Sequence, residues 1–224
     1  AYRANDHGSL LALMSKGGRL LVVRIAADDV AGDHPIITEL PQPKGVVTAL
    51  ALDALLENLY VGTADGQVVH VALSETESPE MRAAYTVAAS STAVTTLGFL
   101  SGDRSLVVMS EDGAVSTWGL VRRADAPSGW TLTQIHTLRP HNAPVTAFAP
   151  SQRVKGFVTG DMKGNLFLHH ATSSQTLLRL ANSEFPIRAV AFAPKGDGLI
   201  ALDGAGQLSL YQVQNAYPEV TLET

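Results

Sequence analysis

Short apolar runs, rich in Val, Leu and Thr, alternate along this chain with turns that contain glycine. Five of the turns align on a glycine, and 42 to 51 residues separate successive members of the series Gly18, Gly66, Gly113, Gly164 and Gly206. Every residue that stands two positions after or seven positions before one of these glycines is apolar. This recurrence predicts a structural repeat in which a strand, a turn and a second strand follow one another.

Two further segments complete the repeat. An alternation of small and larger residues begins 19 positions before four of the glycines, as VTALAL, VTTLGF, VTAFAP and IRAVAF. Another extended candidate follows the glycine turns, in HPIITEL, MRAAYTVA, WTLTQIHTL, TLLRL and EVTLET. Each unit therefore predicts four short strands, of which the small-residue segment is the innermost.

A repeat of this length with four strands is typical of an all-β fold, the β-propeller, whose four-stranded antiparallel blades pack around a central channel. Helical solenoids with a similar period are disfavoured, because the recurring Val, Thr and Gly are poor helix formers. The predicted boundaries are a partial blade over 1–43 and blades over about 44–91, 92–141, 142–184 and 185–224. The first blade is expected to be incomplete, since its inner strand would begin before Ala1, and the chain is interpreted as part of a larger protein.

Composition excludes several classes of function. The 224 residues are 46% hydrophobic, which supports a globular core, and the formal net charge is -5. Basic residues are scattered, and Arg122 and Arg123 form the only adjacent pair, so a nucleic-acid partner is not expected. The chain has no cysteine, which removes disulfides, thiolate zinc sites and cysteine nucleophiles. No apolar run reaches the roughly 18 to 20 residues that cross a bilayer.

The segment from Leu138 to Leu180 resembles a WD40 repeat, with a histidine, the strand VTAFAP, the strand GFVTGD, the turn and a closing TLLRL. In that family a histidine, a Ser or Thr, an Asp before the turn glycine and a Trp form a hydrogen-bonded structural tetrad. His141 and Thr159 match this pattern, whereas Lys163 stands in place of the Asp and His169 in place of the Trp. The missing residue types occur in other units, as Asp65, Asp112 and Trp118, with Tyr211 as an aromatic substitute. The resemblance implies that these residues are structural.

The segments HNAPVTAFAPS and GNLFLHHATSSQTLL carry a narrower resemblance. They are similar to the extra-cytoplasmic propeller of the long, PstC-like permease subunits of bacterial phosphate ABC transporters. This resemblance implies a location at the periplasmic face of the inner membrane and membrane spans outside the chain. It also implies that the protein partners are other subunits of the ABC transporter.

The remaining candidate residues fit structural roles better than catalytic ones. His169 and His170 are consecutive in a predicted strand, so they point to opposite faces and are not expected to bind a metal together. Asp65 and Asp112 could suggest an acid pair, but both occupy the turn position where Asp-Gly favours a tight turn. Arg188 replaces a threonine in the second position of the inner strand, and it is the candidate anion contact if that face lines the channel.

These patterns predict a non-catalytic interaction or sensory domain without cofactor or metal, which presents loops and channel rim to a protein partner. The chain lacks a G-x-S-x-G elbow, an H-E-x-x-H motif, a Walker loop and a Rossmann glycine run. One alternative is a propeller enzyme, a metal-dependent hydrolase or lactonase with a divalent ion in the channel. A third possibility is that the propeller itself senses phosphate through Arg188.

Overall fold

A computed structural model describes residues 1–6, 8–26, 35–74, 79–102, 104–126, 129–138, 140–151, 156–170, 172–173, 175–180, 182–193 and 198–212. These residues form 19 β-strands, and no helix occurs among them. It follows that the described part of the chain contains no helix that could cross a membrane.

The strands form five antiparallel sheets, and each sheet is a meander in which consecutive strands pair. The first sheet contains β1 (Tyr2–Asn5), β2 (Gly8–Met14), β3 (Leu20–Ala26) and β4 (Ile36–Leu40). The second contains β5 (Val47–Leu52), β6 (Asn58–Thr63), β7 (Gln67–Leu73) and β8 (Met81–Ala88). The third contains β9 (Val94–Phe99), β10 (Ser105–Ser110), β11 (Val115–Arg122) and β12 (Trp130–Leu138). The fourth contains β13 (Val145–Pro150), β14 (Gly156–Asp161), β15 (Leu166–His170) and β16 (Gln175–Arg179), and the fifth contains β17 (Ile187–Phe192), β18 (Gly198–Asp203) and β19 (Leu208–Gln212).

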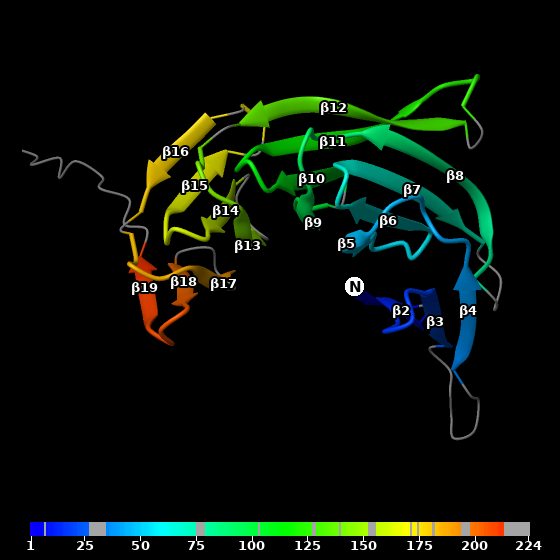
Figure 1. Cartoon of the computed structure of the whole chain (residues 1–224), viewed down its shortest axis with the longest axis horizontal. Coiled ribbons are helices and arrows are strands. Elements are labelled where there is room, and N and C mark those ends of the chain that lie inside the picture. Colours follow the sequence, from blue (N-terminus) through cyan, green and yellow to red (C-terminus); the bar gives the residue numbers. More distant parts are fainter. Residues whose placement is uncertain are drawn as a thin grey trace, which may run out of the picture.

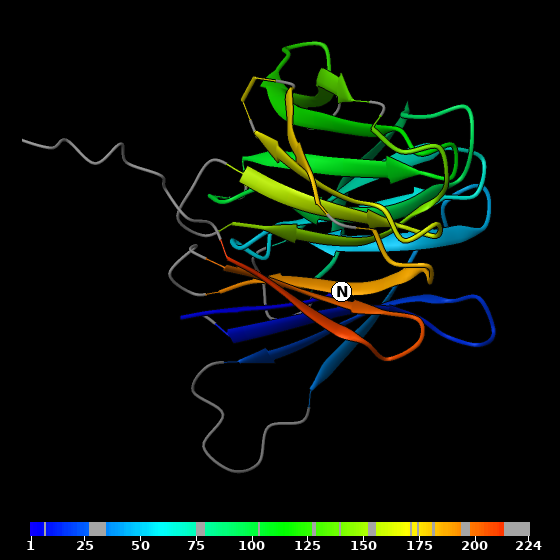
Figure 2. The same cartoon turned by 90° about the vertical axis from the view of Figure 1, so that its left-hand side faces the viewer.

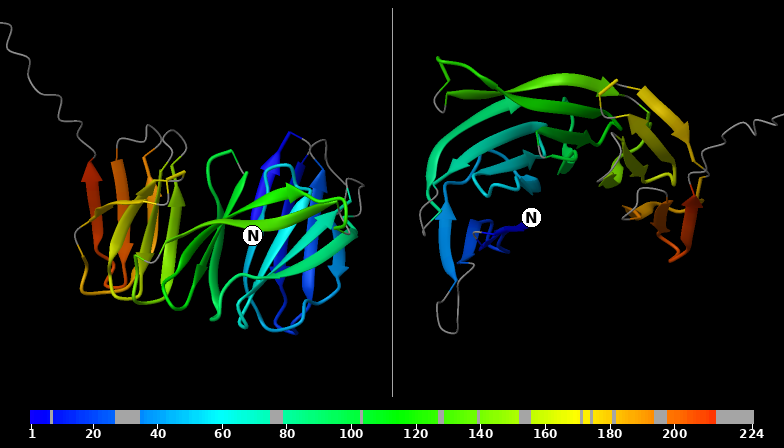
Figure 3. Two further views of the ribbon diagram at one scale, coloured as in Figure 1. Left: turned by 90° about the horizontal axis from the view of Figure 1, so that it is seen from above. Right: turned by 180° about the vertical axis from the view of Figure 1, so that it is seen from behind.

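The five sheets follow one another along an arc, in chain order (Figure 1). The strands β5, β9, β13 and β17 lie on the inner side of this arc, and β4, β8, β12 and β16 lie on its outer side. Figure 2 shows the arc from its side, and Figure 3 shows it from above and from behind. This radial arrangement of four-stranded meanders confirms the predicted β-propeller architecture.

The hydrophobic core is divided among the interfaces between neighbouring sheets. Because successive strand residues point to opposite faces, each sheet supplies apolar side chains to both of its neighbours. Leu10 and Val22 of the first sheet pack with Leu59 of the second, and Val68 of the second packs with Leu106 of the third. Further clusters join the third sheet to the fourth and the fourth to the fifth. Stability therefore depends on the stacking of blades rather than on one central core.

The five aligned glycines all have positive φ angles, between 78° and 83°. At three of these turns, those of Gly66, Gly113 and Gly164, the backbone also approaches the next blade closely. A Cβ atom on Gly66 would lie 2.1 Å from the carbonyl oxygen of Ser90, and one on Gly164 would lie 2.0 Å from that of Ser183. Glycine is thus required both for the left-handed turn and for contact with the loop that enters the following blade.

The first and last sheets differ from the middle three. The first sheet was predicted to be incomplete, yet it has four strands, with an inner strand of only four residues. Tyr2, the first residue of β1, pairs with Leu11 of β2. Leu52, the last residue of β5, pairs with the equivalent residue of β6, Leu59. β1 therefore covers only the end of the space that a full inner strand occupies. In the fifth sheet three strands are described, and the predicted strand EVTLET lies outside the described residues.

Candidate functional site

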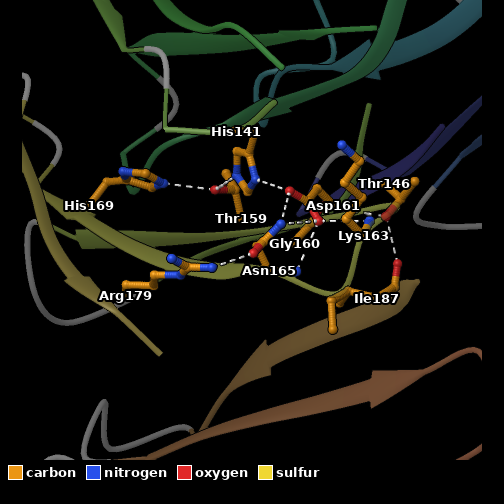
Figure 4. Close-up of polar contacts among 10 residues, drawn as sticks. All are labelled: His141, Thr146, Thr159, Gly160, Asp161, Lys163, Asn165, His169, Arg179 and Ile187. Carbon is orange, nitrogen blue, oxygen red and sulfur yellow. Dashed lines mark hydrogen bonds and ion pairs between the residues drawn. The ribbon is translucent and has the colours of Figure 1, made fainter. Parts of the chain in front are cut away.

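The fourth sheet contains a buried chain of hydrogen bonds that begins at His141, in the loop before β13 (Figure 4). His141 contacts Asp161 through Nδ1 at 2.8 Å and Thr159 through Nε2 at 2.7 Å. Thr159 Oγ1 lies 2.7 Å from Nε2 of His169, whose Nδ1 lies 3.2 Å from the hydroxyl of Thr176. Four elements, the loop before β13 and the strands β14, β15 and β16, are thus joined by polar side chains.

The direction of each proton in this chain follows from Asp161. A carboxylate only accepts, so His141 donates through Nδ1, and its Nε2 must accept the proton of Thr159. Thr159 then accepts a hydrogen bond from Nε2 of His169, and Nδ1 of His169 accepts one from Thr176. With both imidazoles neutral, every polar side-chain atom in the chain has at least one partner in the correct sense.

The electrostatics of the site agree with neutral imidazoles. Burial, and to a lesser extent repulsion by His141, lowers the pKa of His169 to about 3. Burial also lowers the pKa of His141, although the hydrogen bond and the charge of Asp161 oppose this effect. The contact between His141 and Asp161 is therefore a hydrogen bond at neutral pH and not an ion pair.

Asp161 was missed by the sequence interpretation, which looked for a carboxylate at Lys163. The structure provides the carboxylate two residues earlier, where it also closes the turn. Oδ1 of Asp161 accepts the backbone N–H groups of Lys163 and Asn165, both at 2.9 Å, and Oδ2 accepts the Asn165 amide at 2.8 Å. The amide oxygen of Asn165 then accepts a hydrogen bond from Arg179 at 2.9 Å. The network thus extends from the blade interior to the surface.

The second and third sheets stabilise the same turn differently. Ser110 stands where the fourth sheet has Asp161, and its hydroxyl donates to Asp112 at 2.7 Å. Thr63 donates to Asp65 in the same way. Trp118 is buried and donates its indole N–H to Ser116 at 2.8 Å. Of the residues singled out in the WD40-like pattern, the structure brings His141, Thr159 and His169 together, whereas Asp65, Asp112 and Trp118 lie in other sheets.

The two histidines of the HH pair have different surroundings. His169 is fully buried, whereas His170 is partly exposed and contacts the hydroxyl of Ser173 at 2.9 Å. Within the described residues no group of three or more His, Cys, Asp or Glu side chains could hold a metal ion.

Four inner strands, β5, β9, β13 and β17, contain a β-bulge, and the bulged residue is the second one of each strand. In β17, Ile187 pairs with Asp203 and Ala189 with Leu202, so Arg188 is the extra residue. Thr48, Thr95 and Thr146 are skipped in the same way in β5, β9 and β13. A bulge changes the direction of the side chain that it carries. One position in each of these four blades is thereby set apart from the regular ladder on the inner side of the arc.

Arg188 differs from the threonines chemically as well as in size. Thr95 donates its hydroxyl to the carbonyl of Met109 at 3.2 Å, and Thr146 donates to that of Ile187 at 2.6 Å. These hydroxyl protons are therefore already used. Arg188 is exposed, lines a hollow of about 420 Å³ with Thr95 and Thr146, and has no ion pair or hydrogen bond within the described part of the chain.

No family model matches the sequence, and no curated protein matches it either. Solved structures do resemble the fold. The β-propeller domain of Myceliophteria thermophila Cps50 (Swd1) superposes with a TM-score of 0.72 at 18% identity, over 94% of this chain and 68% of that one. The fold is a β-propeller.

Two computationally designed proteins are also similar. Ika8 matches with a TM-score of 0.68 at 19% identity, over 95% of this chain and 57% of its own. Ika4 matches with a TM-score of 0.60 at 19% identity, over 78% of this chain and 96% of its own. At these identities the propeller neighbours establish the fold.

Proposed function

We propose that this propeller is a non-catalytic interaction domain that presents its loops and inner strands to a protein partner. The observation that carries the proposal is the hydrogen-bonded chain from Asp161 to Thr176. The best acid-base candidates of the molecule, His141, His169 and Asp161, are buried there and already paired with one another. With these groups engaged in the scaffold, binding through the surface is the function that the site supports best.

The competing enzymatic function can be tested directly. The purified protein is incubated with 4-nitrophenyl acetate and with a γ-lactone, with and without added Ca²⁺ or Zn²⁺, and its metal content is measured. We expect rates equal to the buffer rate under every condition. Turnover that requires the metal and disappears on chelation would contradict the proposal and favour the hydrolase or lactonase.

We further propose, from the sequence resemblance, that the partner is a phosphate ABC transporter at the periplasmic face of the inner membrane. The segments HNAPVTAFAPS and GNLFLHHATSSQTLL support this assignment. The test is to tag the full-length protein in its native membrane and to identify the subunits that co-purify with it. Membrane spans in the same polypeptide and co-purified transporter subunits are expected, and their absence would remove the transporter while leaving the interaction domain intact.

The finer idea that the propeller senses phosphate rests on Arg188. Its guanidinium is exposed on the inner side of the arc without a carboxylate partner among the described residues. Calorimetric titration with phosphate should give heat that is lost in Arg188→Gln, and not in Arg123→Gln as the control. An absence of heat from the unmodified protein would end this idea.

A further inference from the structure

Two hollows adjoin at the end of the blades where the inner strands finish, opposite the glycine turns. The first has a volume of about 700 Å³ and lies between the second and third sheets, where β12 closes it. The second has a volume of about 580 Å³ and extends toward the first sheet and Pro150. Four residues line both hollows, namely Asp53, Leu55, Phe99 and Arg104. We call the continuous depression the basal groove.

The first hollow of the basal groove has aromatic walls. The rings of Tyr60 and His70 lie 4.9 Å apart, and Phe99 meets Tyr60 edge-on at 5.4 Å. All three side chains are buried at the bottom of the groove, whereas Leu55 and Trp130 at its mouth are 68% and 46% exposed. Solvent-exposed apolar residues around a concave, aromatic site are typical of a binding surface.

The titratable groups Asp53 and His70 in the wall of the basal groove are buried and are joined through the side chain of Asn58. Asp53 is buried and accepts three hydrogen bonds, from the backbone N–H groups of Glu57 and Asn58 and from the Asn58 amide. Because that amide nitrogen donates to Asp53, the amide oxygen accepts the Nε2 proton of His70. Burial lowers the pKa of His70 to about 4, so this histidine is neutral.

Arginine dominates the rim of the basal groove. Arg3 lies at one end of the groove, Arg82 at the other, and Arg104 where the two hollows meet. Among the lining residues, Glu57 is the one partly exposed carboxylate. Arg104 has no ion pair or hydrogen bond within the described residues. The chain as a whole has a formal net charge of -5, so a rim rich in arginine differs from the acidic character of the whole protein. Carboxylates are the complementary ligands, because arginine binds them through two parallel hydrogen bonds.

We propose that the basal groove binds an extended acidic peptide segment of the protein partner. An apolar side chain of the peptide enters the first hollow and packs over Tyr60 and Phe99, and a flanking carboxylate pairs with Arg104. An extended peptide fits two adjoining hollows better than one compact molecule does. It can place an apolar side chain in the first hollow and charged side chains at neighbouring residues. This inference rests on the proposed interaction function and names the surface that performs it.

The tryptophans provide a specific signal for the experiment. The chain contains two, Trp118 and Trp130, and both line the first hollow. Selective excitation of tryptophan fluorescence therefore reports on the basal groove. The probes are three capped tetrapeptides: Glu-Leu-Phe-Glu, its uncharged form Gln-Leu-Phe-Gln, and Glu-Ala-Ala-Glu, which lacks the anchor. The acidic peptide with the anchor should shift the emission saturably, and both controls should bind at least about tenfold more weakly.

Two arginine variants separate binding in the basal groove from general charge effects. Arg104→Gln removes the unpaired cation, and Arg123→Gln removes an exposed arginine whose partner is Asp125, outside the groove. Arg104→Gln should weaken binding of the acidic peptide about tenfold and leave the uncharged peptide unchanged, whereas Arg123→Gln should alter neither. Circular dichroism confirms that both variants are folded.

Three results would overturn the inference: no saturable shift with the acidic peptide, equal affinity for the charged and uncharged peptides, or equal effects of the two variants. Its failure is distinguishable from that of the interaction function. If the full-length protein still co-purifies with a partner after Arg104→Gln, the interaction uses another surface. If metal-dependent turnover is found, the interaction function is wrong whatever the peptides do.

Discussion

Replacement of Thr159 by valine tests whether the buried hydrogen-bond chain stabilises the fold. The substitution keeps the shape of the side chain but removes the hydroxyl that bridges His141 and His169, both at 2.7 Å. Two imidazole nitrogens would then be buried without partners. Each such group costs about 1–3 kcal/mol, so Thr159→Val should lower the free energy of unfolding by about 2–6 kcal/mol.

Thr117 provides a matched control for that experiment. It is 3% exposed and lies in the strand β11, and its hydroxyl has no hydrogen-bond partner. Thr117→Val removes a buried hydroxyl that makes no hydrogen bond among the described residues of the folded protein. The free energy of unfolding should therefore stay the same or rise by up to about 2 kcal/mol.

Urea denaturation followed by tryptophan fluorescence measures both variants. The slope of the unfolding free energy against urea should be the same as in the parent protein, since neither substitution changes the surface exposed on unfolding. Equal losses in the two variants would show that removal of a buried hydroxyl as such, and not the loss of its hydrogen bonds, lowers the stability. A loss below about 1 kcal/mol in Thr159→Val would refute the energetic role of the chain.

Two further predictions concern pH and blade packing. The pKa values of His70 and His169 are lowered to about 4 and about 3. As the pH falls below about 6.5, these histidines bind protons in the unfolded chain but not in the folded chain. The free energy of unfolding is therefore highest above pH 6.5, and it is lower by about 2 kcal/mol per histidine at pH 5. Urea midpoints at pH 5 and pH 7.5 measure this loss. His169→Trp, whose indole can still donate to Thr159, should lessen it, and an unchanged loss would contradict the assignment. Gly160→Ala should cost about 1–3 kcal/mol, because its Cβ would lie 2.5 Å from Cγ2 of Ile187. Gly17→Ala, with its nearest atom 3.8 Å away, should leave the melting temperature almost unchanged.

Strand order and turns could be predicted from the sequence because the repeat imposes one pattern many times. Each glycine turn requires a positive φ angle, and each alternating run requires a pleated, half-buried surface. Those requirements act on neighbouring residues, so they leave a local signal. The four outer strands β4, β8, β12 and β16 were predicted for the same reason and are present.

The partner of His141 could not be predicted by aligning the repeats. Two turn geometries satisfy the same backbone N–H groups, one with a hydroxyl at residue 110 and a carboxylate at Asp112, the other with Asp161 alone. An alignment of the repeats assumes that the carboxylate that stabilises the turn always occupies the same position. Here its position differs by two residues between the blades. The basal groove left no signal either, since Arg3, Leu55 and Trp130 come from separate sheets and meet only in the folded chain.

The bulges in β5, β9, β13 and β17 separate two kinds of sequence constraint. A residue that pairs in the regular ladder must suit both its cross-strand partner and the neighbouring blade. The bulged residue is free of the first requirement, so its identity can vary without altering the register of the sheet. Substitutions confined to Thr48, Thr95, Thr146 and Arg188 would therefore change the polarity of the inner surface of the arc without shifting the strand register. Those at Thr95 and Thr146 would also remove the hydrogen bonds to the carbonyls of Met109 and Ile187.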